Sequence, residues 1–362
     1  MKKLLLSLLS TAMFPLLLLA QDKPAEPPAQ TPEQKADAVA KKFSGKDAVP
    51  EKFQEYFKEF SDIISAKDMP EEQRKALKDK FVEALSKKRT EFAEAVKKSA
   101  GSNQNSALKK KKEELNKLRA ETLKMVNDEQ FYPPKPNPLA DQNQKVIDEK
   151  TAKIKELWTA ASKSLPALPA AAQKNADLIE AINGIFTQMS VNVPAENENL
   201  LKEIALDKKE TDLIAHNKKA WQSNAKIKTG MTDQEKRIVQ LTNEYREMMG
   251  LRVLEMNEIL YTSAKKHADY MDANKYCGHE ENVPGRENPL KRAMLEKYTG
   301  TLVGENAAMH MLDADGIFNG WYNSPSHHRE LVLEPYTQMG VGKTNMSWVI
   351  NFGNGAASFI KK

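Results

Sequence analysis

The sequence predicts an α+β protein in which a long all-helical region precedes a smaller domain of mixed helices and strands. Apolar residues from Phe53 to Ile64 recur at intervals of four, three and four, the spacing of one helix face, and similar stripes continue to about residue 221. The composition then changes near residue 230, after which most glycines and five of the six histidines occur. Beyond that point, residues 347–352 alternate in side-chain character as a strand does.

Residues 1–20 have the features of a secretory signal peptide. Lys2 and Lys3 precede a nearly uncharged apolar run over residues 4–19. The run is short for a membrane span and proline-rich sequence follows it, so we expect cleavage at its end, with an uncleaved anchor as the alternative. Residues 21–48 are expected to be a flexible Pro/Ala-rich leader. No later segment is apolar enough to predict a transmembrane helix.

Residues 49–230 are expected to form five or six antiparallel helices, in a bundle or a stack of hairpins. Turn and proline signals separate the apolar stripes, for example at residues 101–106 and 133–138. From residue 21 to 231, 38 Lys and Arg are mixed with 33 Asp and Glu, which indicates a solvated surface and excludes a nucleic-acid groove. His216 is expected at that surface. We expect this region to act as a spacer or to bind an envelope or protein partner.

Residues 231–362 are expected to form a separate domain that could fold alone. Thr232 and Glu235 have the spacing of a capping box, which marks a helix start. The single cysteine, Cys277, excludes an internal disulfide, so the fold must depend on ordinary core packing. Further helices are expected at about 235–249, 257–274, 288–297 and 313–323.

Six short motifs occur in order along this domain. They are Asn243-Glu244-Tyr245-Arg246, Gly278-His279, Gly304-Glu305-Asn306, Trp321-Tyr322-Asn323-Ser324-Pro325-Ser326-His327, Met339-Gly340-Val341-Gly342 and Trp348-Val349-Ile350-Asn351-Phe352-Gly353. In this order and spacing, over about residues 235–355, they resemble the CAP superfamily of cysteine-rich secretory, antigen 5 and pathogenesis-related proteins. The Asn-Ser-Pro stretch and the absence of disulfide cysteines are similar to the bacterial, SCP-like branch.

The resemblance implies a three-layer α-β-α sandwich with a central, largely antiparallel sheet. It also implies a secreted or periplasmic protein, because members of the family are mostly extracellular and are associated with signalling, defence and lipid or sterol binding. No general enzymatic activity is established for the family.

The resemblance also implies which residues form a cleft. The family's two cleft histidines correspond to His279 and His327, and its glutamate corresponds to Glu305, with Asn306 and Ser324 beside them. Many eukaryotic members place a second acid where this chain has Ser324. A complete site of two histidines and two acids is therefore not expected from the motifs.

Three uses of these side chains follow from their chemistry. His279, His327 and Glu305 could fill three corners of a tetrahedral site for zinc or another divalent metal. Without a metal, the carboxylate could orient a histidine and favour its protonated form, for acid-base chemistry or anion recognition. The third reading is a buried hydrogen-bond network that ties loops together. His328 makes the register ambiguous, and the spacing from Pro325 favours His327 as the residue that points inward.

These observations favour an exported binding module that holds a lipid, sterol, glycan or peptide in the cleft, with or without a divalent metal. One alternative is a zinc-dependent hydrolase or peptidase of the cell envelope. Another is a non-catalytic scaffold that acts through the helical half. Binding is favoured over catalysis because no general enzymatic activity is established for the family that the motifs resemble. A serine nucleophile is not indicated either, since Ser324 and Ser326 flank a proline in a segment expected to be a loop.

Overall fold

The computed structural model describes residues 30–44, 48–100, 106–161, 169–193 and 198–356. The predicted signal peptide lies outside the described residues. The chain divides into two compact units, one ending at Leu85 and the other beginning at Ser86. Within the described ranges, no helix is both long and apolar enough to cross a membrane.

The first unit is built from helices around a core of phenylalanine side chains. Its elements are α1 (Pro32–Lys42), a 3₁₀ turn (Pro50–Lys52), α2 (Phe53–Ile64) and the first half of α3 (Glu71–Ala100). Phe60 stacks on Phe81 with ring centroids 3.8 Å apart. Helix α1 stands where a flexible leader was expected. It forms because Thr31 begins it with a capping box and because Val39 and Phe43 are buried in the core.

The second unit begins with helices that match the predicted apolar stripes. They are α4 (Ser106–Asn127), α5 (Pro138–Ala161), α6 (Ala170–Gln188) and α7 (Glu198–Asn224). The end of α3 packs on α6 and α7 through a small cluster that includes Ala93, Ile179 and Ile204. Helix α5 begins at Pro138, where a missing amide proton costs no hydrogen bond.

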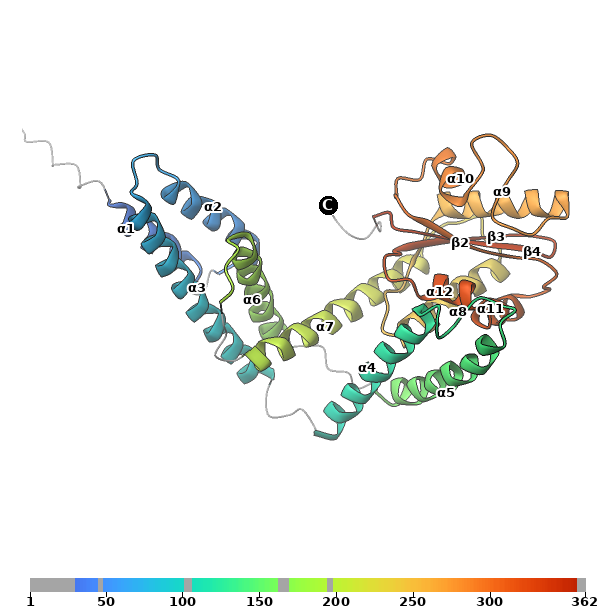
Figure 1. Cartoon of the computed structure of the whole chain (residues 1–362), viewed down its shortest axis with the longest axis horizontal. Coiled ribbons are helices and arrows are strands. Elements are labelled where there is room, and N and C mark those ends of the chain that lie inside the picture. Colours follow the sequence, from blue (N-terminus) through green and yellow to red (C-terminus); the bar gives the residue numbers. More distant parts are fainter. Residues whose placement is uncertain (1–29, 45–47, 101–105, 162–168, 194–197, 357–362) are drawn as a thin grey trace, which may run out of the picture. The chain divides into compact units, whose positions relative to one another are not determined.

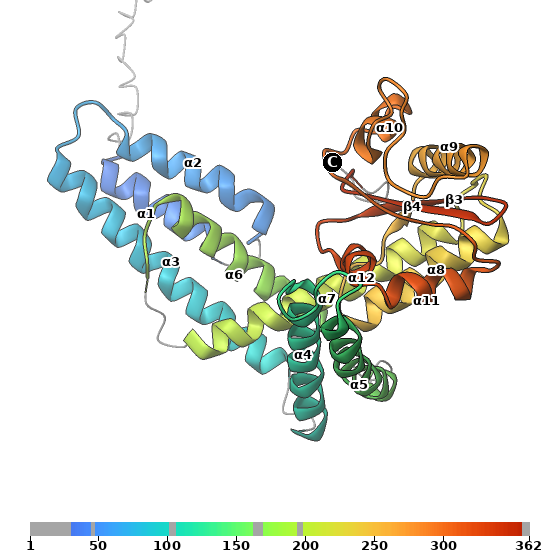
Figure 2. The same ribbon diagram turned by 45° about the vertical axis from the view of Figure 1, so that its right-hand side comes forward.

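The C-terminal part is a three-layer α-β-α sandwich. Its elements are α8 (Asp233–Met248), β1 (Glu255–Met256), α9 (Glu258–Asn274), α10 (Pro289–Leu295), β2 (Val303–Ala308), α11 (Ala314–Tyr322), α12 (Pro325–Val332), β3 (Gln338–Thr344) and β4 (Ser347–Gly353). The sheet order is β1-β3-β4-β2, antiparallel except for the β1–β3 pair. Helices α9 and α10 cover one face, and α8, α11 and α12 cover the other (Figures 1 and 2). The α+β prediction with a helical N-terminal part is confirmed.

Both faces of the sheet are buried, as β4 shows. Trp348 and Ile350 pack in the core shared with α8 and α11, whereas Val349 packs against Ala268 of α9. The predicted alternation therefore distributes apolar side chains to two cores. At Gly340 of β3, an added Cβ would lie only 2.0 Å from the backbone nitrogen of Tyr261, so a glycine is needed for α9 to approach the sheet.

Helix α12 differs from the loop expected around residues 324–327. Pro325 occupies the first turn of this helix, and Ser324 is its N-cap residue. A proline there fits a helix start as well as a loop, because its fixed φ angle suits the first helical position. Local sequence could not separate the two cases. The packing of Leu331 and Val332 into the core selects the helix.

Helix α7 closes the outer edge of the sheet with two asparagine side chains. The amide oxygens of Asn217 and Asn224 accept hydrogen bonds from the backbone nitrogens of Val253 (2.9 Å) and Met256 (2.8 Å). The Asn224 amide nitrogen also donates to the carbonyl of Leu254 at 2.9 Å. The two asparagines lie seven residues apart, hence on one face of α7. The helix thus satisfies backbone groups that an exposed edge strand would leave unpaired.

Candidate functional site

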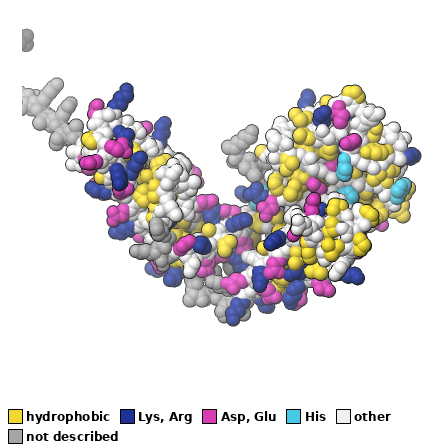
Figure 3. All heavy atoms as spheres, viewed as in Figure 1, with side chains coloured by type: hydrophobic (Ala, Val, Ile, Leu, Met, Phe, Trp, Pro, Cys, Tyr) yellow, Lys and Arg dark blue, Asp and Glu magenta, His cyan; other side chains and the backbone are white. Residues whose placement is uncertain are grey.

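The loop after α9 and strand β2 bring His279 and Glu305 together. Glu305 lies within β2, opposite Asn351 of β4. The Nδ1 atom of His279 lies 3.0 Å from Oε1 of Glu305. The Glu305 side chain is 1% exposed and that of His279 is 51% exposed, so the pair runs from the interior to the surface. Figure 3 shows histidine and acidic side chains at the surface of the C-terminal region.

Arg292 of α10 supplies the counter-charge of Glu305. This arginine is fully buried, and its Nη2 donates to Oε2 of Glu305 at 2.6 Å. Its Nη1 donates to the backbone carbonyls of His279 at 2.8 Å and Arg286 at 3.2 Å. One guanidinium therefore holds both the carboxylate and the loop that carries His279. Arg292 was not among the predicted site residues, and its only sequence signal is an arginine inside a short apolar helix pattern.

A second buried ion cluster lies beside this pair. Glu281 is fully buried, accepts a hydrogen bond from Nη2 of Arg286 at 2.9 Å and lies 2.9 Å from Nδ1 of His267. The Nε2 atom of His267 lies 2.8 Å from the carbonyl of Gly278 and 3.5 Å from Oε1 of Glu305. Because both ring nitrogens face acceptors, both short hydrogen bonds form together only when the ring carries two protons. His267 thus links the carboxylates of Glu281 and Glu305.

Helix α12 gives its two neighbouring histidines different surroundings. His327 is half-buried, its Nδ1 lies 2.9 Å from Oγ of Ser324, and its backbone carbonyl accepts a hydrogen bond from Nδ2 of Asn306 at 3.0 Å. His328 is fully buried, with Nε2 2.7 Å from the hydroxyl of Tyr245. Successive helical residues point about 100° apart, so the two rings occupy different sides of α12.

Glu330 is a second acid on the His327 side of α12, one that the motifs did not predict. It follows His327 by three residues, which places both on one helix face. Its Oε2 accepts a hydrogen bond from the hydroxyl of Tyr336. Both groups lie over Gly304, where an added Cβ would meet the hydroxyl at 1.8 Å and the carboxylate oxygen at 2.2 Å. Glu330 thus supplies an acid six residues after Ser324, where an acid was not expected. Its place beside His327 follows from the spacing only if this segment is a helix.

The two histidines have pKa values shifted in opposite directions. The hydrogen bond to Glu305 raises the pKa of His279 above its ordinary value of 6.5. Burial, and then the nearby charge of His279, lowers the pKa of His327 to about 4. Burial raises the pKa of Glu330 above its ordinary value. The site therefore places an imidazole that is readily protonated near one that stays neutral. Such opposite pKa shifts give two side chains of the same kind different chemical roles.

We expect Glu305→Gln to lower the pKa of His279, because a neutral amide stabilises the imidazolium less than a carboxylate does. Since the folded-state pKa is raised, the stabilisation is present below pH 6.5 and is lost as the pH rises through the folded pKa. The variant should lose this pH dependence. Ring-proton NMR from about pH 4 to about 9 measures the titration.

Glu280→Gln is the control for this titration, because Glu280 is exposed and adjoins His279 in sequence. It should leave the His279 titration close to that of the parent protein. A His279 pKa that is the same in Glu305→Gln and in the parent would show that the carboxylate does not set the protonation of the ring.

We expect Gly304→Ala to lower the free energy of unfolding by about 1–3 kcal/mol, the usual cost of overpacking. The new methyl group would displace the Tyr336 hydroxyl and the Glu330 carboxylate. Gly184→Ala is the matched control, because nothing lies within 4 Å of a Cβ there. As an interior residue of α6, it should gain up to about 1 kcal/mol. Chemical denaturation measures both, and equal effects would contradict the close approach over β2.

Two of the three predicted metal ligands keep a free ring nitrogen, whereas Glu305 does not fit direct coordination. Its oxygens already bond Arg292 and His279, and its side chain is 1% exposed. His279 and His327 use Nδ1 toward Glu305 and Ser324, and Nε2 of each ring has no hydrogen-bond partner among the described residues. Among the described residues, no group of three or more His, Cys, Asp or Glu side chains is arranged to hold a metal ion. The contacts suit Glu305 to orienting an imidazole instead.

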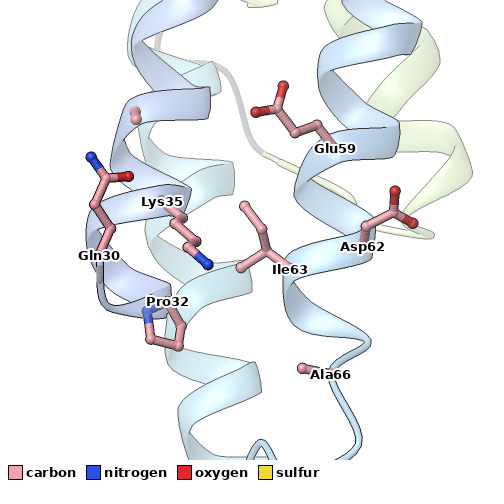
Figure 4. A pocket seen from close by; sticks show the side chains of 8 residues that line it. Gln30, Pro32, Lys35, Glu59, Asp62, Ile63 and Ala66 are labelled. Carbon is pink, nitrogen blue, oxygen red and sulfur yellow. The ribbon is translucent and has the colours of Figure 1, made fainter. Parts of the chain in front are cut away.

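A groove in the first unit is as large as a ligand pocket, but charged side chains make up much of its lining. It lies between α1 and α2, measures about 490 Å³ and includes Lys35, Glu59, Asp62 and Ile63 (Figure 4). Ligand pockets are usually lined mainly by apolar side chains with a few placed polar groups. Glu59 is also paired with Lys42 at 2.5 Å. The lining of this groove is therefore more charged than that of a usual ligand pocket.

Residues 239–352 match the family model described as the Cysteine-rich secretory protein family, CAP. The matched segment runs from α8 to β4 and contains His279, Glu305, His327 and Glu330. The helices before α8 lie outside it.

Two Bacillus subtilis (strain 168) proteins are similar to this part of the chain. The uncharacterized membrane protein YlbC is 33% identical over 131 residues, 36% of this chain and 37% of its own. The uncharacterized protein YkwD is 29% identical over 108 residues, 30% of this chain and 41% of its own. The chain thus matches about two fifths of the length of these relatives.

A solved structure of an extracellular protein containing an SCP domain, from Bacillus anthracis, is 29% identical. It covers 34% of this chain and 40% of its own, with a TM-score of 0.32.

Proposed function

Because residues 239–352 are a bacterial CAP-superfamily domain, we propose that this protein is an exported binding module whose ligand contacts His279 and His327. The observation that carries the proposal is a half-exposed imidazole anchored on a buried, charge-compensated carboxylate. The Glu305–Arg292 pair holds His279 in place without offering a free charge of its own. In its protonated form, which the Glu305 carboxylate favours, His279 has a second ring nitrogen that can donate a hydrogen bond to a ligand.

The surroundings support a ligand with both polar and apolar parts. The polar groups are a donor, His279, and an acceptor, Glu330, whose charges interact. Nearby on the His279 loop and α10, Val283, Met294 and Leu295 are exposed to 38%, 59% and 55%. Exposed large apolar side chains on neighbouring segments are available for an apolar part of a ligand. A lipid, a sterol or an apolar peptide would suit this combination, and a glycan would use the polar groups alone.

Export is proposed from the signal-like first residues, and the extracellular SCP-domain relative is consistent with it. A partner for the helical half is part of the same proposal. In that role the helices would position the CAP domain at the cell envelope.

The test is a binding screen with the whole mature chain, since the C-terminal core is shared with α4 and α5. Phospholipid vesicles, sterols, soluble glycans and a peptide library are titrated against the parent protein and His279→Ala. We expect a ligand that binds the parent and loses at least about tenfold in affinity in the variant. The Glu280→Gln protein should bind as the parent does. No ligand in any class, or equal affinity in His279→Ala, would sink the proposal.

A divalent metal held by the two imidazoles, and the zinc hydrolase that would use it, stay predictions. Metal analysis of the native protein beside His279→Ala tests them directly. Metal that remains bound in Glu305→Gln but is lost in His279→Ala would identify the imidazoles as the ligands and the carboxylate as an orienting group.

A further inference from the structure

One face of helix α12 carries His327 and Glu330, and another face packs against the hairpin formed by α4, α5 and the loop between them. Residues 106–161, which contain this hairpin, lie outside the family match. In Figures 1 and 2, α4 and α5 lie beside the layer of α8, α11 and α12. The apolar residues of the hairpin, including Leu115, Val126, Ile147 and Ile154, belong to the same buried cluster as Leu331 of α12.

The centre of this contact is an aromatic enclosure around His328. Its ring centroid lies 4.5 Å from that of Tyr322, 5.6 Å from Tyr245 and 6.1 Å from Tyr132 of the hairpin loop. Its Nε2 bonds the hydroxyl of Tyr245, and its Nδ1 has no hydrogen-bond partner in the described structure. A fully buried polar ring in such a place depends on the surrounding side chains for its position.

Polar contacts join the hairpin to both sides of this enclosure. Arg329 of α12 donates to the backbone carbonyl of Tyr132, and its guanidinium lies 5.9 Å from the Tyr132 ring. The Tyr132 hydroxyl donates to Gln144, whose amide nitrogen donates to Asp148 at 2.8 Å. Asp148 also accepts a hydrogen bond from the hydroxyl of Tyr322 at 2.9 Å. A continuous chain of hydrogen bonds therefore runs from the hairpin to α11, beside the direct contact with α12.

The cleft side of the same helix carries His327 and Glu330. An eight-residue helix is too short to be stable by itself, so its position is set by what it packs against. On one side that is the sheet, through Asn306 and the β2 backbone. On the other side it is the hairpin.

We propose that the α4–α5 hairpin is a positioning element of the cleft, which holds α12 so that His327 and Glu330 face His279. Tyr132 is its principal positioning residue, because it is fully buried and contacts both His328 and Arg329. The inference rests on the proposed function only for the reason why α12 should be held in place. The contacts that hold α12 do not depend on that function. The binding site would then extend beyond the family domain into the helical region.

The test uses the full chain and no ligand. Diethyl pyrocarbonate modifies accessible imidazoles, and mass spectrometry with peptide fragmentation separates His327, His328 and His279. Hydrogen exchange of residues 325–332 reports the mobility of α12. In Tyr132→Ala we expect exchange of the α12 amides to accelerate at least about tenfold, and the ratio of His327 to His279 modification to change at least about threefold.

Tyr132→Phe is the conservative variant, since it keeps the ring against His328 and loses only the hydroxyl. It should restore most of the parent behaviour, and it keeps the test valid if Tyr132→Ala fails to fold. Leu139→Ala is the matched control, because Leu139 lies on α5 but is 39% exposed. Faster exchange confined to the hairpin, with α12 and the His327 ratio unchanged, would overturn the inference. A failed ligand screen with a changed His327 ratio would refute only the proposed function.

Discussion

Arg292→Met is expected to lower the free energy of unfolding by about 3–5 kcal/mol, the cost of breaking a buried ion pair from one side. Methionine fills similar space but leaves the carboxylate of Glu305 without its 2.6 Å partner in a side chain that is 1% exposed. It also removes the donor to the carbonyl of His279, so the loop should loosen. Chemical denaturation measures the first effect, and hydrogen exchange at residues 278–282 measures the second.

Arg237→Met is the control for this result. Arg237 pairs with Asp315 at 2.9 Å, but the side chains are 38% and 62% exposed, and exposed pairs contribute little. The control should therefore change stability far less than Arg292→Met. Equal effects in the two variants would mean that the buried network around Arg292 does not hold the site residues in place. The orienting role assigned to Glu305 would then have to be abandoned.

Asn224→Ala should lower the free energy of unfolding by about 1–3 kcal/mol, because the buried backbone nitrogen of Met256 would lose its partner, whereas the carbonyl of Leu254 would keep its hydrogen bond from Asn243. The amide of Asn224 serves the nitrogen of Met256 and the carbonyl of Leu254, and water has little access because Asn224 is 9% exposed. The measurement is chemical denaturation, with hydrogen exchange at residues 253–256 as the local reading.

Asn175→Ala is the matched control on α6. Its amide nitrogen donates to the carbonyl of Ala171 in its own helix at 2.8 Å, in a solvent-exposed hydrogen bond. A change within about 0.5 kcal/mol is expected there. If Asn224→Ala lowered the free energy of unfolding as little as this control, α7 would lie beside the sheet edge without stabilising its backbone groups.

These contacts change how the helical region relates to the C-terminal domain. Helices α4, α5 and α7 satisfy backbone and side-chain groups of the domain, and the apolar cluster is continuous across α4, α5 and α8. A domain expected to fold alone has part of its surface covered by segments outside the family match. The boundary predicted at residue 231 stays a prediction, while the packing shows why cutting there would expose buried groups.

The positions of helices and the main site residues could be predicted because their signals are local or carried by motifs. The stripes from Phe53 onward, the capping box at Thr232 and the alternation in β4 each depend on neighbouring residues alone. The motif order placed His279 and Glu305 in one cleft, and their side chains are 3.0 Å apart. His328 is fully buried and His327 is half-buried, and the assignment of His327 to the cleft stays a prediction, as does what the site binds.

Other features depended on contacts between segments far apart in the chain. His216 was expected at the surface but lies half-buried, 3.2 Å from the carbonyl of Val253. The role of Arg292 depends on the carboxylate of Glu305, which lies thirteen residues later in the chain. The two side chains meet because α10 packs against β2.

The sequence by itself determined the class of fold, because periodicity and motif spacing are local signals, and it proposed His279, His327 and Glu305 as the residues of a site. Tertiary structure alone decided the state of those groups. Burial and partner charges come from segments that are distant in the sequence. Arg292 neutralises Glu305, so that this carboxylate anchors His279, and the surroundings shift the pKa values of His279 and His327 in opposite directions. Tertiary packing also places the α4–α5 hairpin against α12, the helix that carries His327 and Glu330.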